Sequence, residues 1–426
     1  MLRSPIHHTF APLAGRKQCL EAMRWLLCPW QWRKSFSRDC LRAALEERFG
    51  AKVFLFSSGR EGLAAFLLSM ELQPGDEVIV QGYTCVAVVN AIRSAGAVPR
   101  YADIDPETLN LTVETVKLAL SPKTRALICQ HTFGIPADLP SLRSLCDRER
   151  IVLIEDCAHI IADARGPRAL GMVGDATMLS FGRDKAISGV TGGAILLWNN
   201  DLSEHMRMHE SQAVPLPALH VARLLLYPLL YALARPLMGL RIGFGFLTLW
   251  KALKLLPPIL TQEEKEGTTL TTIHPLPEPC AALALHQWKQ LEAINNHRRM
   301  LTALYCSLLC RANQTILAGI TPDLPLQKFP MFARNAPGVR AILKKKNIHL
   351  SDGWTGCVVC QASVALEQTA YVPGSDPEAE RASTMILNLP THPGTSRAQA
   401  EMLCSLLLPL LQASGNTRIS SEYASG

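Results

Sequence analysis

Residues 151–159 read IVLIEDCAH, and residues 178–193 read MLSFGRDKAISGVTGG. In each stretch a short apolar run, at 151–154 and at 178–181, predicts a buried strand. The first run ends in Glu155 and Asp156, and the second is followed by Lys185 and several glycines. An acid that closes one strand and a lysine just beyond the next are expected to lie close together at the edge of a sheet.

The same pattern extends outward over residues 40–200, where apolar runs alternate with helical segments. The expected strands are 53–56, 77–80, 98–103, 126–130, 151–154, 178–181 and 194–198, and the expected helices are 61–70, 86–94, 113–120 and 139–148. This alternation predicts an α/β fold, with a mostly parallel central sheet flanked by helices. Ligands bind beyond the carboxyl ends of such strands, and the polar residues expected there are Ser58, Tyr83, His131, Asp156 and Ser180.

Lys185 and Asp156 together indicate a site for pyridoxal phosphate (PLP). A lysine amine forms a Schiff base with the aldehyde of PLP, and a carboxylate keeps the pyridine nitrogen protonated. A carboxylate at the end of an apolar strand is poorly solvated and needs a positive partner, which the ring nitrogen would supply. Taken singly, Asp156 is also explained as a helix N-cap and Lys185 as a surface residue.

Residues 57–62 read SSGREG and stand between an expected strand and an expected helix. Small residues at Ser58 and Gly59 would let backbone N–H groups meet a phosphate at the helix N-terminus. The hydroxyl of Ser180 is a second candidate donor to that phosphate. His159 is a candidate to stack on the cofactor ring or to bond its phenolic oxygen, and a core histidine is the alternative.

Composition narrows the class of protein. The 426 residues are 48% hydrophobic and 19% charged, which describes a globular chain with a large core. The net charge of +7 is spread along the chain without a dense basic run, so nucleic-acid binding is not expected. Thirteen irregularly spaced cysteines favour a reducing compartment. Cys357 and Cys360 form a lone C-x-x-C without further ligands, so we expect buried thiols and no metal.

Residues 213–260 depart from the α/β pattern. No Asp or Glu occurs between Ser211 and Gln262, whereas five Lys or Arg residues lie among apolar ones. The uncharged runs are shorter than the roughly 20 residues of a spanning helix, and Pro228 and Pro236 are expected to kink them. Contact with one leaflet of an anionic membrane, an oligomer interface and a lid on the site all remain open. Residues 23–34, rich in tryptophan and basic residues, leave membrane contact or packing equally open.

These patterns divide the chain into five parts. We expect an N-terminal segment at 1–40, a large PLP-binding domain at 41–205, the hydrophobic basic insertion at 206–265, a smaller α+β domain at 266–411 and a disordered tail at 412–426. In the smaller domain we expect helices at 281–299, 300–312, 334–346 and 398–411, and an edge strand at 347–350.

Several phrases of the sequence resemble the DegT-type sugar aminotransferases, PLP enzymes of fold type I. The phrases are PGDEVIV at 74–80, DIDPETLN at 103–110, GIPAD at 134–138, IEDCAH at 154–159, LSF at 179–181 and LNLPTHP at 387–393. The resemblance implies that Lys185 is the Schiff-base lysine, that Asp156 is the partner of the pyridine nitrogen and that His159 lies near the ring. It places Ser180 and the Gly59-Arg60 turn on the phosphate. It also implies a homodimer that takes an amino group from an amino acid such as glutamate and passes it to a keto sugar, often nucleotide-linked.

The chain departs from that family at a few positions. Cys85 stands where an aromatic residue usually stacks on the cofactor, and Tyr83 is the candidate to replace it. The family's aromatic-Asn-aromatic-Arg run is missing near residues 272–275.

From the resemblance and the basic apolar insertion, we expect an aminotransferase of cell-surface polysaccharide or glycolipid synthesis. We expect it to be cytoplasmic or peripheral at the inner face of the membrane. The alternatives are a non-catalytic, membrane-associated relative and another PLP reaction such as sugar dehydration.

Overall fold

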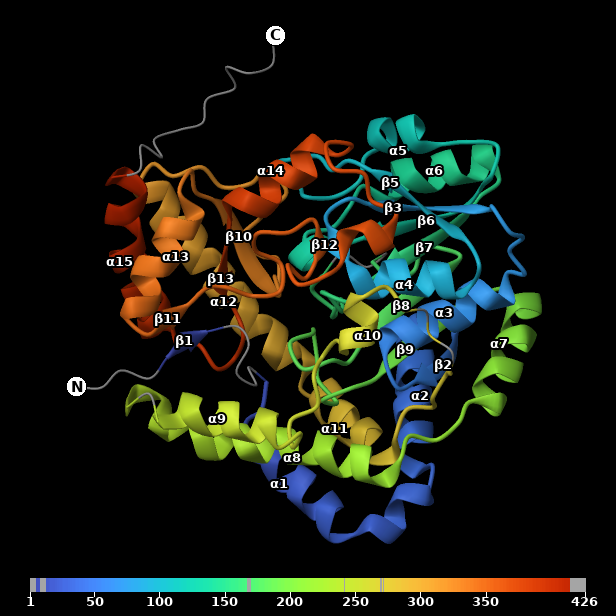
Figure 1. Cartoon of the computed structure of the whole chain (residues 1–426), viewed down its shortest axis with the longest axis horizontal. Coiled ribbons are helices and arrows are strands. Elements are labelled where there is room, and N and C mark those ends of the chain that lie inside the picture. Colours follow the sequence, from blue (N-terminus) through green and yellow to red (C-terminus); the bar gives the residue numbers. More distant parts are fainter. Residues whose placement is uncertain are drawn as a thin grey trace.

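The structure is a computed structural model that describes residues 5–7, 13–166, 170–240, 242–268, 270 and 272–413. A large domain with a central sheet lies beside a smaller domain, and a layer of helices runs below both (Figure 1).

Seven strands form the central sheet in the order β2-β9-β8-β7-β6-β3-β5. They are β2 (Lys52–Phe56), β3 (Glu77–Gln81), β5 (Val98–Ala102), β6 (Thr124–Gln130), β7 (Val152–Asp156), β8 (Ala176–Ser180) and β9 (Gly193–Leu197). Only β9 runs against its neighbours. The link from β8 to β9 returns without a crossover helix, which makes that pair antiparallel. The predicted mostly parallel α/β sheet is confirmed, and Lys185 lies on this link.

Helices cover both faces of the sheet, as the apolar character of its strands requires. One face packs against α3 (Gly59–Ser69), α4 (Val86–Ser94) and α7 (Asn200–Gln212). The other packs against α2 (Phe36–Phe49), α5 (Val113–Ala119), α6 (Leu139–Glu149) and α11 (Glu278–Trp288). Side chains alternate along a strand, so the neighbours Glu155 and Asp156 of β7 point to opposite faces.

The smaller domain is α+β and holds a second hydrophobic core. Its elements are α12 (Leu291–Arg311), β10 (Lys328–Phe332), α13 (Ala336–Lys345), β11 (Ile348–His349), β12 (Val359–Cys360), η4 (Leu366–Thr369), α14 (Pro377–Met385), β13 (Ile386–Pro390) and α15 (Arg397–Ala413). Strand β10 pairs with β13, β11 with β1 (Ile6–His7), and β12 with β4 (Thr84–Cys85) of the large domain. The β12–β4 pair therefore joins the two domains beside Cys85.

The predicted boundary between helices at 281–299 and 300–312 is wrong. The helical segment is interrupted at Lys289 and Gln290, between α11 and α12, and α12 continues through residue 300. Helix α11 packs on α2 in the large domain, whereas the later turns of α12 pack in the smaller core, so the chain must turn between them. No Gly or Pro marks that turn in the sequence. Of the predicted tail, Gln412 and Ala413 belong to α15, and residues 414–426 lie outside the described part.

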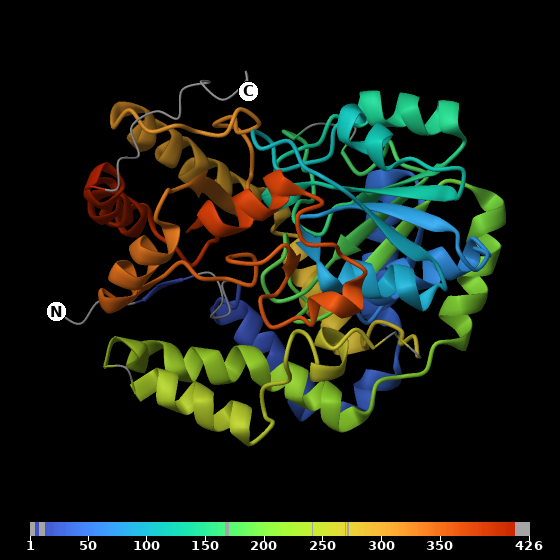
Figure 2. The same cartoon turned by 45° about the horizontal axis from the view of Figure 1, so that its top comes forward.

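The insertion folds into α8 (Ala218–Ala234), η3 (Arg235–Leu240) and α9 (Ile242–Ala252), followed by the short α10 (Gln262–Lys265). Helix α8 packs against α1 (Arg16–Leu27), which leads into η1 (Pro29–Arg33), and the layer forms the lower edge of Figures 1 and 2. Helix α8 continues past Pro228, and Pro236 lies in η3. By length and composition, Ala218–Leu240 is the one described helical stretch that could cross a membrane, although 44% of its most apolar part is buried.

Candidate active site

The Lys185 loop is held by buried groups on both sides. Arg298 of α12, itself buried, donates to the carbonyl oxygens of Lys185 (3.0 Å) and Ala186 (2.8 Å). Burial lowers the pKa of Arg298 to about 10, so it remains a cation at neutral pH. From β10's side, the Gln327 amide donates to the carbonyl oxygen of Asp184. These bonds fix the backbone of the loop and leave the side chain of Lys185 half-buried.

Asp156 closes β7 beside this loop. Its Oδ1 accepts the N–H of Ala158 at 2.9 Å, and its side chain is almost fully buried. Burial raises the pKa of Asp156 above its usual value, while the nearby charge of Lys185 opposes that rise. The sequence therefore folds a buried acid and a lysine to the same edge of the sheet, where the charge of Lys185 acts on Asp156.

The third part of the site is the N-terminal turn of α3. The Ser58 hydroxyl caps the helix by accepting the N–H of Glu61. A Cβ added to Gly59 would lie 2.8 Å from Met178 Sδ and 3.2 Å from Ser180 Cβ, so the start of α3 packs closely against β8. Ser180 thus lies against the start of α3. The first N–H groups of a helix, here those of Gly59 and Arg60, have no acceptor within it, and such groups favour an anion.

Glu61 organises this turn, and sequence reasoning did not single it out. Its Oε1 accepts the hydroxyl of Ser57 at 2.6 Å, and its Oε2 accepts the N–H of His274 at 2.7 Å. The ring of His274 also lies 3.4 Å from Oε2. Residues 272–275, where the family's usual run is missing, are therefore tied to the start of α3. In the sequence, the only signal for this contact is that an acid at 61 and a histidine at 274 can pair.

His159 lies in an aromatic group between the two domains. Its Nδ1 accepts the N–H of Phe133 at 3.1 Å, so the proton of the neutral ring is on Nε2. Burial, and then the charges of Lys185 and Lys328, lower the pKa of His159 well below its usual value. One face of its ring stacks on Phe133, and Trp354 meets it edge-on at 4.9 Å. His159 is thus a neutral N–H donor with one ring face covered.

The side chains of two candidate residues, Tyr83 and Arg60, are bonded to other parts of the chain. Tyr83 is completely buried, and its hydroxyl donates to the carbonyl oxygen of Trp354. This packing corrects the expectation that Tyr83 replaces the stacking aromatic, because no atom of its ring reaches an open surface. The guanidinium of Arg60 pairs with Glu264 of α10 and donates to Ile259 (2.6 Å), so only the backbone of Arg60 is available at the phosphate turn.

Cys85 lies near Lys185 and Asp156, because the charges of both act on its thiol. In the parallel pair of β4 and β12, Cys85 lies opposite Cys360, and its side chain is half-buried. Burial raises the pKa of the Cys85 thiol, although the charge of Lys185 partly opposes it, so the thiol is protonated at neutral pH. A small apolar thiol therefore occupies the place where the resemblance leads one to expect an aromatic ring.

A second lysine, Lys328, lines a cavity together with Lys185, and sequence analysis did not identify it. The cavity is lined by Leu13, Asp184, Lys185, Arg298, Gln327, Lys328 and His392. Lys328 of β10 is buried, with its Nζ 2.9 Å from Asp352 and 3.9 Å from Asp184. Burial alone would lower the pKa of Lys328, but these two carboxylates outweigh it and raise the pKa. Lys328 is therefore a paired cation, whereas Lys185 makes no ion pair within 4 Å in the described structure.

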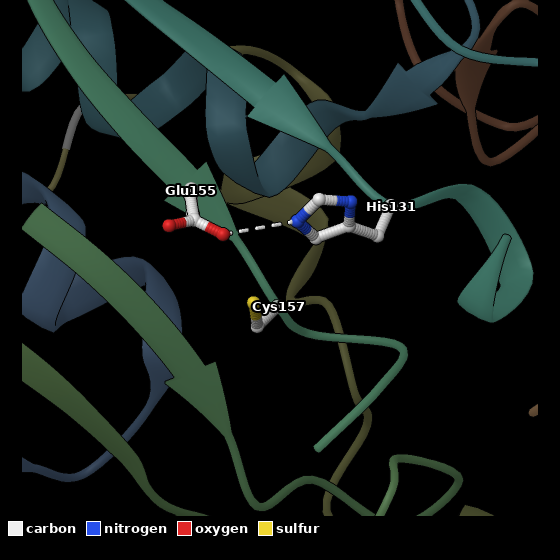
Figure 3. A group of neighbouring side chains, drawn as sticks. All are labelled: His131, Glu155 and Cys157. Carbon is white, nitrogen blue, oxygen red and sulfur yellow. Dashed lines mark hydrogen bonds and ion pairs between the residues drawn. The ribbon is translucent and has the colours of Figure 1, made fainter. Parts of the chain in front are cut away.

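His131, Glu155 and Cys157 also come together, buried behind the sheet edge (Figure 3). The N–H of Ala137 donates to His131 Nδ1, so His131 Nε2 carries the proton and donates to Glu155 at 3.3 Å. Glu155 also accepts the N–H groups of Gly171, Val173 and Gly174. A metal ion would have to displace these hydrogen bonds. We therefore interpret His131, Glu155 and Cys157 as a structural cluster in which Glu155 holds the loop after β7 in place.

Replacing Glu155 is expected to weaken the fold in a pH-dependent way. Burial alone would raise the pKa of Glu155, but the bonds from His131, Gly174 and Gly171 outweigh it and lower the pKa below 4.5. The ionised Glu155 carboxylate therefore stabilises the fold above pH 4.5, and this stabilisation is lost as the pH falls through the lowered pKa. Glu155→Gln should cost about 1–3 kcal/mol at pH 7. Thermal melts from pH 3 to pH 8 should show that the difference in stability between the wild type and Glu155→Gln becomes smaller in acid. A difference that becomes larger in acid would contradict this prediction.

The assembled residues fit PLP. Lys185 offers an amine without a carboxylate partner, Asp156 offers a buried acid beside it, and the Gly59 turn meets Ser180 where a phosphate needs donors. His159 adds a neutral N–H donor. The site thus brings together Ser58, Gly59, Cys85, Asp156, His159, Ser180 and Lys185, and it does not include the side chains of Tyr83 and Arg60.

Comparison with known proteins points the same way. The profile of the DegT/DnrJ/EryC1/StrS aminotransferase family matches residues 18–218 and 261–408 and leaves out 219–260, which form the insertion. The GDP-perosamine synthase of Vibrio cholerae is 39% identical over 146 residues, which are 34% of this chain and 40% of that protein. The chain therefore aligns with less than half the length of this relative.

Solved structures share the fold over almost the whole chain. NtdA from Bacillus subtilis, solved with the bound cofactor PMP, has a TM-score of 0.73 at 19% identity and covers 96% of this chain and 86% of its own. DesV from S. venezuelae has a TM-score of 0.74 at 22% identity and covers 96% and 99%. At these identities the likeness concerns the fold.

Proposed function

Because this chain belongs to the DegT/DnrJ/EryC1/StrS aminotransferase family, we propose that it is a PLP-dependent aminotransferase. It takes an amino group from an amino acid such as glutamate and transfers it to a keto sugar linked to a nucleotide. The observation that carries this proposal is the meeting of Lys185, Asp156 and the α3 N-terminus at one edge of the sheet. These are the amine, the acid and the phosphate donors that the cofactor needs.

When bound, PLP supplies an electron sink for the charge left on a carbon that has lost its proton. Lys185 would hold the cofactor through Nζ and, once released, would move a proton away from the α carbon of the amino donor. Asp156 would keep the ring nitrogen protonated through its negative charge. The Nε2–H of His159 would donate to the phenolic oxygen, and the α3 N–H groups and the Ser180 hydroxyl would bind the phosphate.

The substrate class rests on the relatives. The relative named a GDP-perosamine synthase supports a nucleotide-linked sugar as the acceptor. We also propose cell-surface polysaccharide or glycolipid synthesis as the use of the product. We further propose that the chain forms a homodimer. All 13 cysteines are free, which supports a reducing compartment such as the cytoplasm.

Borohydride trapping tests this proposal directly. Purified protein would be incubated with PLP, reduced with sodium borohydride, digested and mapped by mass spectrometry. The cofactor should be found on the peptide that contains Lys185, and the unreduced protein should transfer nitrogen from glutamate to nucleotide-linked keto sugars. Labelling of another lysine, or no labelling at all, would overturn the proposal. Labelling of Lys185 without amino transfer to any acceptor would favour a non-catalytic relative.

A further inference from the structure

Helix α9 of the insertion carries a row of exposed apolar side chains. Ile242, Phe246 and Leu249 recur at helical spacing, Leu253 follows directly after the helix, and the four are 39–57% exposed. A second face of α9 holds the helix in place: Gly243 and Leu247 are buried, and a Cβ at Gly243 would lie 2.4 Å from the carbonyl oxygen of Ala234. The row is therefore not needed for packing within the chain, and a row of this size on a soluble surface indicates a contact.

Helix α1 carries a matching row on the same layer. Leu20, Met23 and Leu27 are exposed at helical spacing, and Trp30 of η1 is 68% exposed just beyond them. Helices α1 and α9 both pack on α8, and Figure 1 places the three helices at the lower edge of the molecule. We call the exposed faces of α1, η1 and α9 the lower apolar surface.

The charges around this surface are mostly positive. No acid occurs between Ser211 and Gln262, whereas Arg235, Lys251 and Lys254 are exposed there. The segment of α1 and η1 adds five exposed cations, Arg16, Lys17, Arg24, Arg33 and Lys34, against the single acid Glu21. Apolar and aromatic side chains among cations suit the boundary between the headgroups and the acyl chains of an anionic leaflet.

The same charges argue against a second copy of this chain as the partner. In a two-fold dimer the same patch meets itself, so the exposed cations would face one another with almost no acid between them. An anionic lipid surface meets them with opposite charge instead.

Helix α8 links this surface to the site and is not itself free to enter a membrane. Its buried side chains include Leu224, Leu225, Tyr227 and Tyr231. The guanidinium of Arg183, two residues before Lys185, lies 4.1 Å from the centre of the Tyr227 ring and donates to Pro257 at 2.6 Å. The Lys185 loop and the helical layer are thus in direct contact.

We propose that the lower apolar surface docks on the surface of an anionic lipid bilayer, with α1, η1 and α9 lying in one leaflet. Docking of this kind would hold the cofactor site close to the membrane. The helices lie along the bilayer and do not cross it.

Flotation with liposomes tests the proposal on the full-length protein. Vesicles of phosphatidylglycerol and phosphatidylethanolamine should carry the protein upward, and vesicles of phosphatidylcholine should not. The variant Leu249→Glu/Leu253→Glu, and separately Lys251→Glu/Lys254→Glu, should each lower the partition coefficient at least about tenfold, since each cation near such a surface contributes markedly to binding. Raising the salt to 0.5 M should weaken binding of the wild type.

A matched control lies on α5, at the opposite edge of the molecule (Figure 1). Leu118 is 86% exposed, and Lys117 and Lys123 are exposed nearby. Lys117→Glu/Lys123→Glu therefore matches the double lysine variant in number and charge, and Leu118→Glu introduces one acid in place of an exposed leucine. These variants should float like the wild type. Equal flotation on neutral and anionic vesicles, or equal losses in the α5 variants, would overturn the proposal. So would a wild type that does not float while Leu249→Glu/Leu253→Glu splits an oligomer in light scattering.

Discussion

Lys185→Ala should abolish amino transfer, with a loss of at least about 10³-fold in kcat/KM, because the variant loses both the covalent anchor and the proton carrier. It should also lose the borohydride-stable label. Lys185→Arg keeps the charge beside Asp156 but has no amine that can condense with an aldehyde, so it should be equally inactive. Absorbance, labelling and turnover of the reconstituted proteins measure the three effects.

Lys328 provides the matched control for this prediction. Both lysines line the same cavity, but Lys328 is buried and paired with Asp352, which keeps it protonated and therefore poorly nucleophilic. Lys328→Met should keep the borohydride label on Lys185. If Lys185→Ala retains the label and Lys328→Met loses it, the roles of the two lysines are reversed and the assignment of Lys185 is wrong.

Asp156→Asn should separate activity from stability. The amide cannot keep a ring nitrogen protonated, so we expect kcat/KM to fall by about 10²–10³-fold, as when an aimed electrostatic partner is removed. Burial raises the pKa of Asp156 in the folded chain. A raised pKa means that the protonated form stabilises the fold and that this benefit is lost as the pH rises through the folded value. The neutral amide should therefore leave the cofactor-free protein at pH 7 as stable as the wild type, or more so.

Asp163→Asn is the control with the opposite sign. Asp163 pairs with Arg299 at 2.5 Å; burial alone would raise its pKa, but Arg299 outweighs burial and lowers it. Its stabilising effect is present above pH 3.8 and is lost as the pH falls further. Asp163→Asn should therefore cost about 1–3 kcal/mol at pH 7. Thermal melts of both cofactor-free variants test the pair, and an Asp156→Asn protein that is less stable yet fully active would refute the role of Asp156.

The insertion connects these predictions with the setting of the reaction. Arg183 contacts Tyr227 of α8, and the family profile leaves out residues 219–260. Helices α8 and α9 are therefore largely an addition to the family fold, and α8 reaches the Lys185 loop. An acceptor that resides at a membrane would meet the site there.

Much of the fold could be predicted because its signals are local. A buried parallel strand needs an apolar run, and the loops at its carboxyl end tolerate polar residues, so Asp156, Ser180 and Lys185 stood out in the sequence. The helix boundary at Lys289 and Gln290 could not be predicted, since it arises where α11 and α12 pack in different domains and no Gly or Pro marks it.

The α/β class, the cofactor chemistry and an insertion of unusual charge could all be read from the amino-acid sequence, because each depends on residues near one another along the chain. The surroundings of Lys185 could be known only from how distant segments pack. Arg298 lies 113 residues from it in sequence, and Tyr83 meets Trp354 across 271 residues. Such contacts form when separate helices and strands pack, and a buried cation or ring looks the same in the sequence whether it binds a cofactor or supports the loop that does.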